Sequence, residues 1–94
     1  MTDIDAVDFY WRPGCPFCSS LERNLVQQGL PLRKLNIWED ERHAAAVRQV
    51  AGGNETVPTV VVGTVSMVNP RPAEVLQAVQ AQAPQLLPAG VDHS

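Results

Sequence analysis

Residues 4–18 read IDAVDFYWRPGCPFC, and this stretch decides which fold the chain can adopt. From Ile4 to Tyr10, apolar and polar residues alternate loosely, which is the pattern of a buried or half-buried strand. Pro13 and Gly14 then interrupt the pattern as a loop does. From Pro16 onward the apolar spacing becomes helical, so the stretch predicts a strand, a loop and the start of a helix.

The remaining chain contains two further helices and three further strands. The first helix is predicted from Pro16 to about Gln28, because Gly29 and Pro31 favour a helix end. The acidic run at 39–41 opens a second helix, where negative charge suits the N-terminal dipole, and Gly52 ends it. A third helix ends before Pro84. We predict the strands at residues 32–38, 56–62 and 65–68, the last two joined by a turn at Gly63 and Thr64.

The element order is therefore β-α-β-α-β-β-α, which predicts the α/β class. Two strands joined by a helix should be parallel, and two joined by a tight turn should be antiparallel. We expect a four-stranded mixed sheet with three helices distributed over both faces. Residues 1–83 should form one domain, and residues 84–94 a flexible C-terminal tail.

Composition excludes several classes of function. The 94 residues are 45% hydrophobic and 18% charged, which suits one small globular domain. The net charge of −3 argues against a nucleic-acid partner. No apolar run approaches the roughly 18–20 residues that span a bilayer, and the acidic N-terminus lacks the features of a signal peptide. We expect a cytoplasmic monomer with no membrane partner.

Cys15 and Cys18 are the only two cysteines, and they lie at the start of the first helix. Unpaired N–H groups and the positive end of the dipole favour a thiolate there. Cysteines of Cys-x-x-Cys motifs in this position have lowered pKa values. Cys15 is the predicted nucleophile, and Cys18, one turn later, can attack a mixed disulfide formed at Cys15.

Other readings of the two cysteines stay open at this point. A structural disulfide would close a very short loop, and such bonds are rare in the cytosol. A zinc site requires about four ligands, and the two histidines lie far away in sequence. An iron–sulfur cluster shared between two chains would give a non-enzymatic carrier. The favoured interpretation has no metal ligand and no bound cofactor.

Two motifs carry a resemblance to a known family. The segment Tyr10–Cys18 resembles the active-site stretch of glutaredoxins, and Thr56-Val57-Pro58 resembles their second signature. The resemblance covers about residues 4–83 and implies a thioredoxin-like fold with Pro58 as a cis-proline beside Cys15. On the residues alone, Pro58 could instead be a trans-proline that begins an edge strand.

The resemblance also implies the remaining substrate-binding residues. The backbone of Val57 would pair with a bound thiol peptide, with Thr56 and Pro58 in the same loop. Arg12 would attract a substrate carboxylate, although a solvated loop arginine is the plain alternative. Pro16 and Phe17, between the cysteines, would complete this side of the site.

One segment departs from the common glutaredoxin pattern. Many glutathione-dependent members have Gly-Gly and an acidic residue after the fourth strand, whereas this chain has Met67–Pro72, reading MVNPRP. Asn69 and Pro70, with the run Gly52–Pro58, are similar to mycoredoxins. These proteins reduce mixed disulfides of mycothiol, a sugar-based thiol.

The resemblance thus implies a thiol-disulfide oxidoreductase whose co-substrate is a low-molecular-weight thiol, with mycothiol favoured over glutathione. Its other partners would be proteins that carry mixed disulfides. Asn69 would bind substrate. The alternatives are a dithiol redoxin reduced by thioredoxin reductase and the iron–sulfur carrier.

Overall fold

The computed structural model describes residues 4–87 and has the element order expected from the sequence. The strands are β1 (Val7–Trp11), β2 (Leu32–Asn36), β3 (Thr59–Val62) and β4 (Val65–Val68). The helices are α1 (Pro16–Gln27), α2 (Glu41–Val50) and α3 (Pro72–Gln82), followed by the short 3-10 helix η1 (Pro84–Leu86). The predicted α/β class and the three helices are therefore confirmed.

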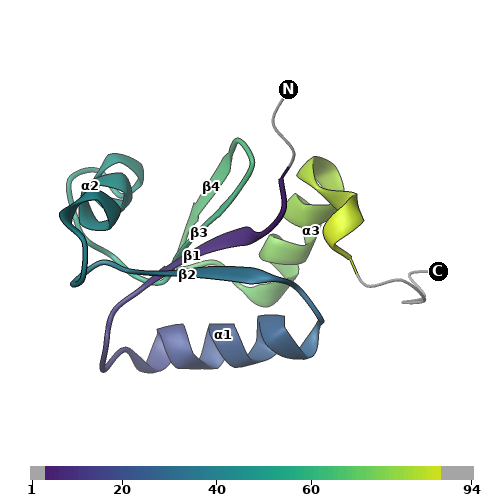
Figure 1. The fold of residues 1–94 in the computed structure, drawn as a ribbon, viewed down its shortest axis with the longest axis horizontal. Helices are drawn as coiled ribbons and strands as arrows, with labels where there is room; N and C mark the ends of the chain where they lie inside the picture. The colour runs from purple at the N-terminus through teal and green to yellow at the C-terminus, as the bar shows by residue number, and fades with distance from the viewer. Residues whose placement is uncertain (1–3, 88–94) are drawn as a thin grey trace.

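The four strands form one mixed sheet in the order β2-β1-β3-β4 (Figure 1). β1 and β2 are parallel, and their last residues, Trp11 and Asn36, lie opposite each other. β1 is antiparallel to β3, and β3 to β4. Parallel strands end at the same edge of a sheet, so the segments after β1 and β2 leave it side by side.

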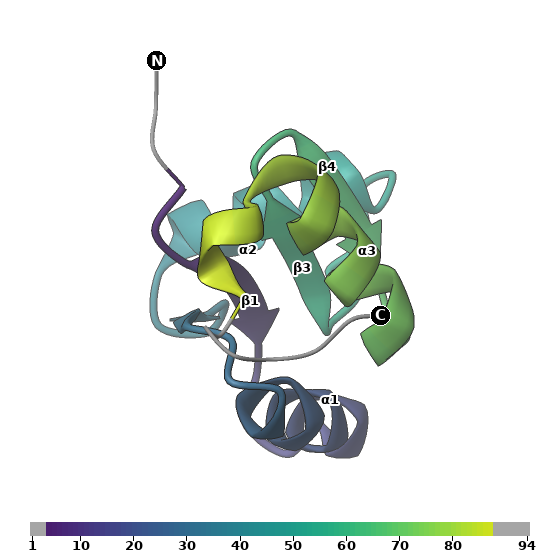
Figure 2. The same ribbon diagram turned by 90° about the vertical axis from the view of Figure 1, so that its right-hand side faces the viewer.

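Helices cover both faces of the sheet, as predicted. The larger core lies between the sheet and the pair α1 and α3, and α3 packs alongside β3 (Figure 2). Its fully buried members include Phe9 from β1, Leu25 from α1 and Val79 from α3. On the opposite face, α2 buries Ala44 and Val47 against Ile37 and Tyr10.

Three predicted strand boundaries were wrong by two or three residues. β1 begins at Val7 rather than Ile4. β2 ends at Asn36 rather than Trp38, because the Asn36 side chain accepts the Trp38 backbone N–H at 2.9 Å and turns the chain. β3 begins at Thr59 rather than Thr56, because the Thr59 hydroxyl donates to the Thr56 carbonyl and closes a turn there.

The helix ends follow the capping signals in the sequence. Pro16 is the first residue of α1, where its missing N–H leaves no bond unmade. Gly29 has a positive φ of 81°, the conformation that commonly ends a helix. Asp40 caps α2 by accepting the Arg42 backbone N–H at 2.9 Å.

Structure continues past residue 83, where the tail was expected to begin. η1 follows α3 directly, and Leu86 and Leu87 are partly buried against the larger core. The side-chain amide of Gln85 donates to the Ile4 carbonyl at 3.0 Å. These four residues, 84–87, therefore extend the packed unit, and the remainder of the expected tail, 88–94, lies outside the described residues.

Candidate active site

Cys15 and Cys18 form a disulfide at the N-terminus of α1. Cys15 is the N-cap residue, and its sulfur accepts the backbone N–H of Cys18 at 3.1 Å. Both cysteines are almost completely buried, with 6% and 2% of their surfaces exposed. The backbone N–H groups of a first helical turn otherwise lack partners, so the helix start itself stabilises negative charge on the Cys15 sulfur.

The segment Thr56–Pro58 lies against the disulfide, although it is 38 or more residues away in sequence. The Val57–Pro58 peptide bond is cis, as the family resemblance implied. The Val57 carbonyl oxygen lies 3.9 Å from the Cys15 sulfur. Val57 is half-buried and Thr56 is exposed, so the edge of this segment is accessible beside the sulfur.

Asn69 joins the site from the other end of the hairpin. It has a positive φ of 49°, a left-handed conformation that asparagine tolerates better than most residues. Its backbone N–H donates to the Pro58 carbonyl at 2.7 Å. This bond fixes the segment after β4 next to the cis-proline, so the structure brings Asn69 to the site predicted for it.

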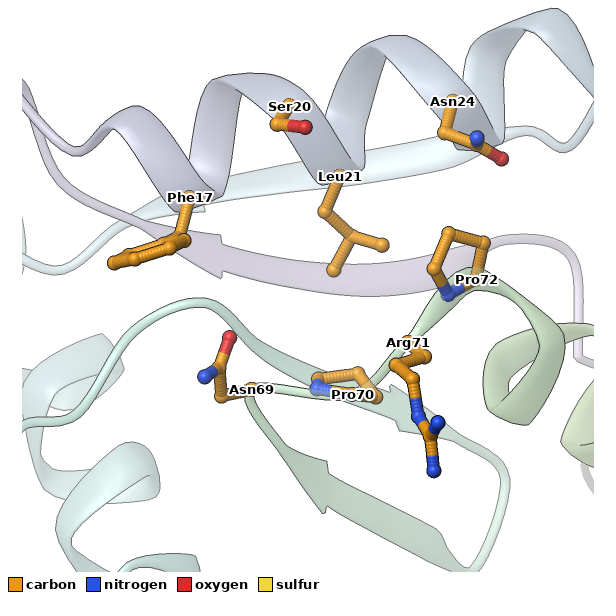
Figure 3. Close-up of a pocket in the computed structure, with 8 residues that line it drawn as sticks. All are labelled: Phe17, Ser20, Leu21, Asn24, Asn69, Pro70, Arg71 and Pro72. Carbon is orange, nitrogen blue, oxygen red and sulfur yellow. The ribbon is translucent and has the colours of Figure 1, made fainter.

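A cavity of about 240 Å³ lies between α1 and the segment after β4 (Figure 3). Its walls are Phe17, Ser20, Leu21 and Asn24 from α1, and Asn69, Pro70, Arg71 and Pro72 from the opposite side. The lining contains amides, a hydroxyl and a guanidinium but no carboxylate. Phe17, which is 68% exposed, connects the cavity to the first turn of α1 and thus to the cysteines.

Phe17 and Asn69 of this cavity were predicted from the sequence, whereas three polar residues were not: Ser20, Asn24 and Arg71. The helical spacing of α1 could have predicted Ser20 and Asn24. The α1 residues of the lining follow the i, i+3, i+4, i+7 spacing from Phe17, which places them on one face of the helix. No pattern in the sequence indicates that Arg71 lines the cavity, because its position depends on the conformation of the loop after β4.

Arg12 directly follows β1 and lies outside this cavity. Its guanidinium carbon is 5.7 Å from the centre of the Trp38 ring, and one of its N–H groups donates to the Pro13 carbonyl at 3.3 Å. Trp38 is 64% exposed. Pro16 is exposed at the first position of α1. The predicted binding residues therefore fall into two groups, with Arg12 beside Trp38 and separate from Asn69 and the cavity.

Two side-chain acids have shifted pKa values, and both lie toward the α2 side of the sheet. The side-chain and backbone hydrogen bonds from Arg42 lower the pKa of Asp40 from 3.8 to about 2. Burial, and then the charge of Asp8, raise the pKa of Tyr10.

Within residues 4–87, no group of three or more His, Cys, Asp or Glu side chains is arranged to hold a metal ion. None of the helices in that range is long and apolar enough to cross a bilayer.

A Cys-x-x-Cys pair that starts a helix after the central strand β1, with a cis-proline beside the first sulfur, defines a thioredoxin-like redox protein. The sequence of residues 7–67 matches the family model described as Glutaredoxin. The chain therefore belongs to the glutaredoxin family, and Cys15 and Cys18 are its redox pair. No curated protein sequence gives a significant match.

Solved structures of related proteins share the fold. The glutaredoxin-like protein NrdH-redoxin from Escherichia coli, described as having a thioredoxin-like activity profile, is 25% identical with a TM-score of 0.67. The match covers 78% of this chain and 93% of that one. Glutaredoxin from Brucella melitensis is 24% identical with a TM-score of 0.60, covering 97% of both chains. Buckwheat glutaredoxin, in a glutathione complex, is 20% identical over 85% of this chain and 74% of that one, with a TM-score of 0.59.

Proposed function

We propose that this protein is a thiol-disulfide oxidoreductase that reduces mixed disulfides between a low-molecular-weight thiol and proteins. The observation that carries the proposal is the placement of the Cys15 sulfur. It caps α1, accepts the Cys18 N–H at 3.1 Å and lies 3.9 Å from the Val57 carbonyl oxygen. The sulfur is thus electrostatically favoured as a thiolate beside an accessible backbone segment that can align a substrate.

In the first step the Cys15 thiolate attacks the small-thiol sulfur of the mixed disulfide. The bond between the protein and the small thiol breaks, and a disulfide between Cys15 and the small thiol forms. The protein leaves as a thiolate and takes a proton from water. The protein cysteine is reduced, and the oxidising equivalent moves to Cys15.

Two routes can release the small thiol from Cys15. A second molecule of the small thiol can attack the adduct, which regenerates the Cys15 thiolate and yields the oxidised small thiol. Alternatively, the Cys18 thiolate attacks the Cys15 sulfur, which expels the small thiol and forms the Cys15–Cys18 disulfide seen in this structure. An external dithiol must then supply two electrons and two protons. Both routes suit a reducing compartment, so we place the reaction in the cytoplasm.

The cavity beside Phe17 supports mycothiol rather than glutathione as the small thiol. The γ-glutamyl end of glutathione carries an ammonium group beside its carboxylate, and a protein carboxylate would bind that ammonium well. The cavity lining has no carboxylate. Its amides and hydroxyl, from Ser20, Asn24 and Asn69, are suited to hydroxyl groups such as those of a sugar.

Matched substrates test the proposal. The same peptide is prepared as a mixed disulfide with mycothiol and with glutathione, and kcat/KM is measured with the same thiol as reductant. We expect reduction of both, with mycothiol favoured by about tenfold, roughly the effect of one satisfied polar contact. Cys15→Ser should be inactive on both. Full activity of that variant would refute the mechanism, and equal rates for the two thiols would refute the mycothiol preference.

The comparison with NrdH-redoxin favours a second candidate, a dithiol redoxin that receives electrons from thioredoxin reductase. That protein is described as having a thioredoxin-like activity profile and is among the more similar structures. In this case thioredoxin reductase with NADPH should reduce the Cys15–Cys18 disulfide directly. Turnover with that reductase and none with either small thiol would favour the second candidate.

A further inference from the structure

A loop with little backbone restraint of its own connects α2 to Thr56–Pro58, the segment that lies against the Cys15 sulfur. Gly52 and Gly53 in this loop have positive φ angles of 66° and 96°, and all residues from 52 to 56 are exposed. Glycine has more conformational freedom than any other residue, so the loop by itself does not fix the position of the segment.

The contacts of the segment with β3, β4 and α1 use only its carbonyl groups. The Thr59 hydroxyl donates to the Thr56 carbonyl at 2.8 Å, and the Asn69 N–H donates to the Pro58 carbonyl at 2.7 Å. The Val57 carbonyl oxygen lies 3.9 Å from the Cys15 sulfur. Within residues 4–87, the backbone N–H groups of residues 56 and 57 have no acceptor. These N–H groups are available to a bound substrate, but they do not restrain the segment.

Arg48 connects the segment to α2. It lies in the last turn of α2, and its two terminal nitrogens bind different carboxylates. Nη1 donates to Glu55 at 2.6 Å, and Nη2 donates to Glu41 in the first turn of the same helix. The bond to Glu41 fixes the guanidinium along the surface of α2, and the bond to Glu55 holds the residue that directly precedes Thr56–Pro58.

The Val57 side chain adds a second link between the segment and α2. It packs against both hydrophobic cores, and the smaller core includes Ala44 and Val47 of α2. The ion pair of Arg48 with Glu55 is partly exposed, and such pairs contribute little to global stability. Its expected effect is local, because it restrains a short segment that follows two glycines.

We propose that Arg48 is a positioning residue, which through Glu55 holds the backbone of Thr56–Pro58 beside Cys15, where the protein half of the mixed disulfide aligns. This inference rests on the proposed function, which supplies the substrate that aligns there. Without the ion pair the segment would sample more conformations, and a substrate would have to order it on binding. The expected effect is therefore on KM rather than on kcat.

The experiment measures KM and kcat for a peptide that carries mycothiol, and in parallel glutathione, as a mixed disulfide. Arg48→Met and Glu55→Met replace each charged end with an uncharged one of similar length. Each should raise KM about threefold with kcat retained, the effect expected of one exposed ion pair. The double variant should cost no more than either single variant, because both remove the same contact.

Two further variants separate positioning from a loss of charge. Arg48→Lys keeps a charge that can reach Glu55 and should keep KM near the wild-type value. Arg42→Met removes the same type of side chain from the same helix. Within residues 4–87 the Arg42 side chain pairs with Asp40 and not with the loop, so this variant should also keep the wild-type KM.

Two measurements without the peptide substrate test the same point. Alkylation of reduced Cys15 by iodoacetamide requires no aligned peptide and should keep its wild-type rate in Arg48→Met. A glutamyl endopeptidase cleaves after Glu55, and the rate relative to cleavage after Glu22 in α1 reports local opening of the segment. This ratio should rise about threefold in Arg48→Met and stay unchanged in Arg42→Met.

Each outcome decides the inference. An unchanged KM or an unchanged cleavage ratio in Arg48→Met overturns it and leaves the proposed function standing. A lower kcat together with slower alkylation of Cys15 in that variant would show a general structural effect and also overturns it. If the wild type reduces neither mixed disulfide, the proposed function fails and the inference fails with it.

Discussion

The sulfur of Cys15 lies 3.1 Å from the backbone nitrogen of Cys18, so the first cysteine of the pair is the cap of the helix that carries the second. This contact links the reactivity of the Cys15 sulfur to the backbone of α1. A negative charge on the Cys15 sulfur is stabilised by a donor that α1 must satisfy in any case. The Cys18 sulfur lies inside the first turn, and we therefore expect the two cysteines to have different roles.

The first prediction separates these roles. Cys18→Ser should retain most activity on mixed disulfides of the small thiol, because a second small thiol can release the adduct from Cys15. It should lose activity by at least about 100-fold on substrates with an intramolecular disulfide, which require both thiols. Steady-state rates on the two substrate types test this. Equal retention on both would show that Cys18 does not resolve the intermediate.

The second prediction concerns reactivity toward an alkylating agent. In the reduced protein at pH 7, iodoacetamide should modify Cys15 at least about tenfold faster than Cys18, because the helix start favours its thiolate. Peptide mapping by mass spectrometry after short exposures gives the two rates. Faster modification of Cys18 would reverse the assignment of the nucleophile. The protein has no third cysteine to complicate the result.

The third prediction concerns Asp40, the cap of α2. Its pKa is lowered from 3.8 to about 2 by hydrogen bonds from Arg42, so the carboxylate stabilises the fold at neutral pH. This contribution should be lost as the pH falls from about 4 to about 2. Asp40→Ala should therefore denature at a lower urea concentration than the wild type at pH 7, and the difference should shrink toward pH 2. Glu39→Ala, which lies outside α2, serves as the control; an unchanged Asp40→Ala difference at low pH would contradict the prediction.

The fourth prediction compares two glycines that both have a positive φ. Gly63 has a φ of 60°, and an added Cβ would lie 2.7 Å from the end of Ile4 and 2.8 Å from the Gln82 amide oxygen. That oxygen accepts hydrogen bonds from Thr64, so moving it breaks them. Gly52 has a φ of 66° with open space around it.

Gly52→Ala should thus cost about 1–2 kcal/mol, the cost of a left-handed alanine alone. Gly63→Ala should cost about 1 kcal/mol more, because it also clashes and disrupts the contacts of Gln82. Urea denaturation of both variants measures the difference in the free energy of unfolding. Equal losses would show that the Gly63 turn has room for a side chain.

Much of the fold could be predicted from local signals. The capping residues set the helix ends, and the change from alternating to helical spacing after Gly14 placed the cysteines correctly. Strand ends were less predictable. β2 ends where the Asn36 side chain bonds the Trp38 backbone, a contact that apolar spacing does not reveal. β3 starts late because of a hydroxyl contact between Thr59 and Thr56.

The candidate site was predictable only where a motif marked it. Cys15, Phe17 and Pro58 belong to such motifs. Trp38 did not stand out, because its position beside Arg12 depends on the parallel register of β1 and β2. The cavity wall formed by Arg71 depends on the left-handed turn at Asn69, which is a property of the folded loop.

The most direct test of the central claim is to trap the intermediate on Cys15. Reduced Cys18→Ser protein, which retains a single cysteine, is incubated with the disulfide of mycothiol and its intact mass is measured. We expect rapid gain of one mycothiol unit, reversed by free mycothiol, whereas Cys15→Ser should acquire it at least about 100-fold more slowly. Equal rates for the two variants, or no adduct on Cys15, would contradict the assignment of Cys15 as the nucleophile that carries the small thiol.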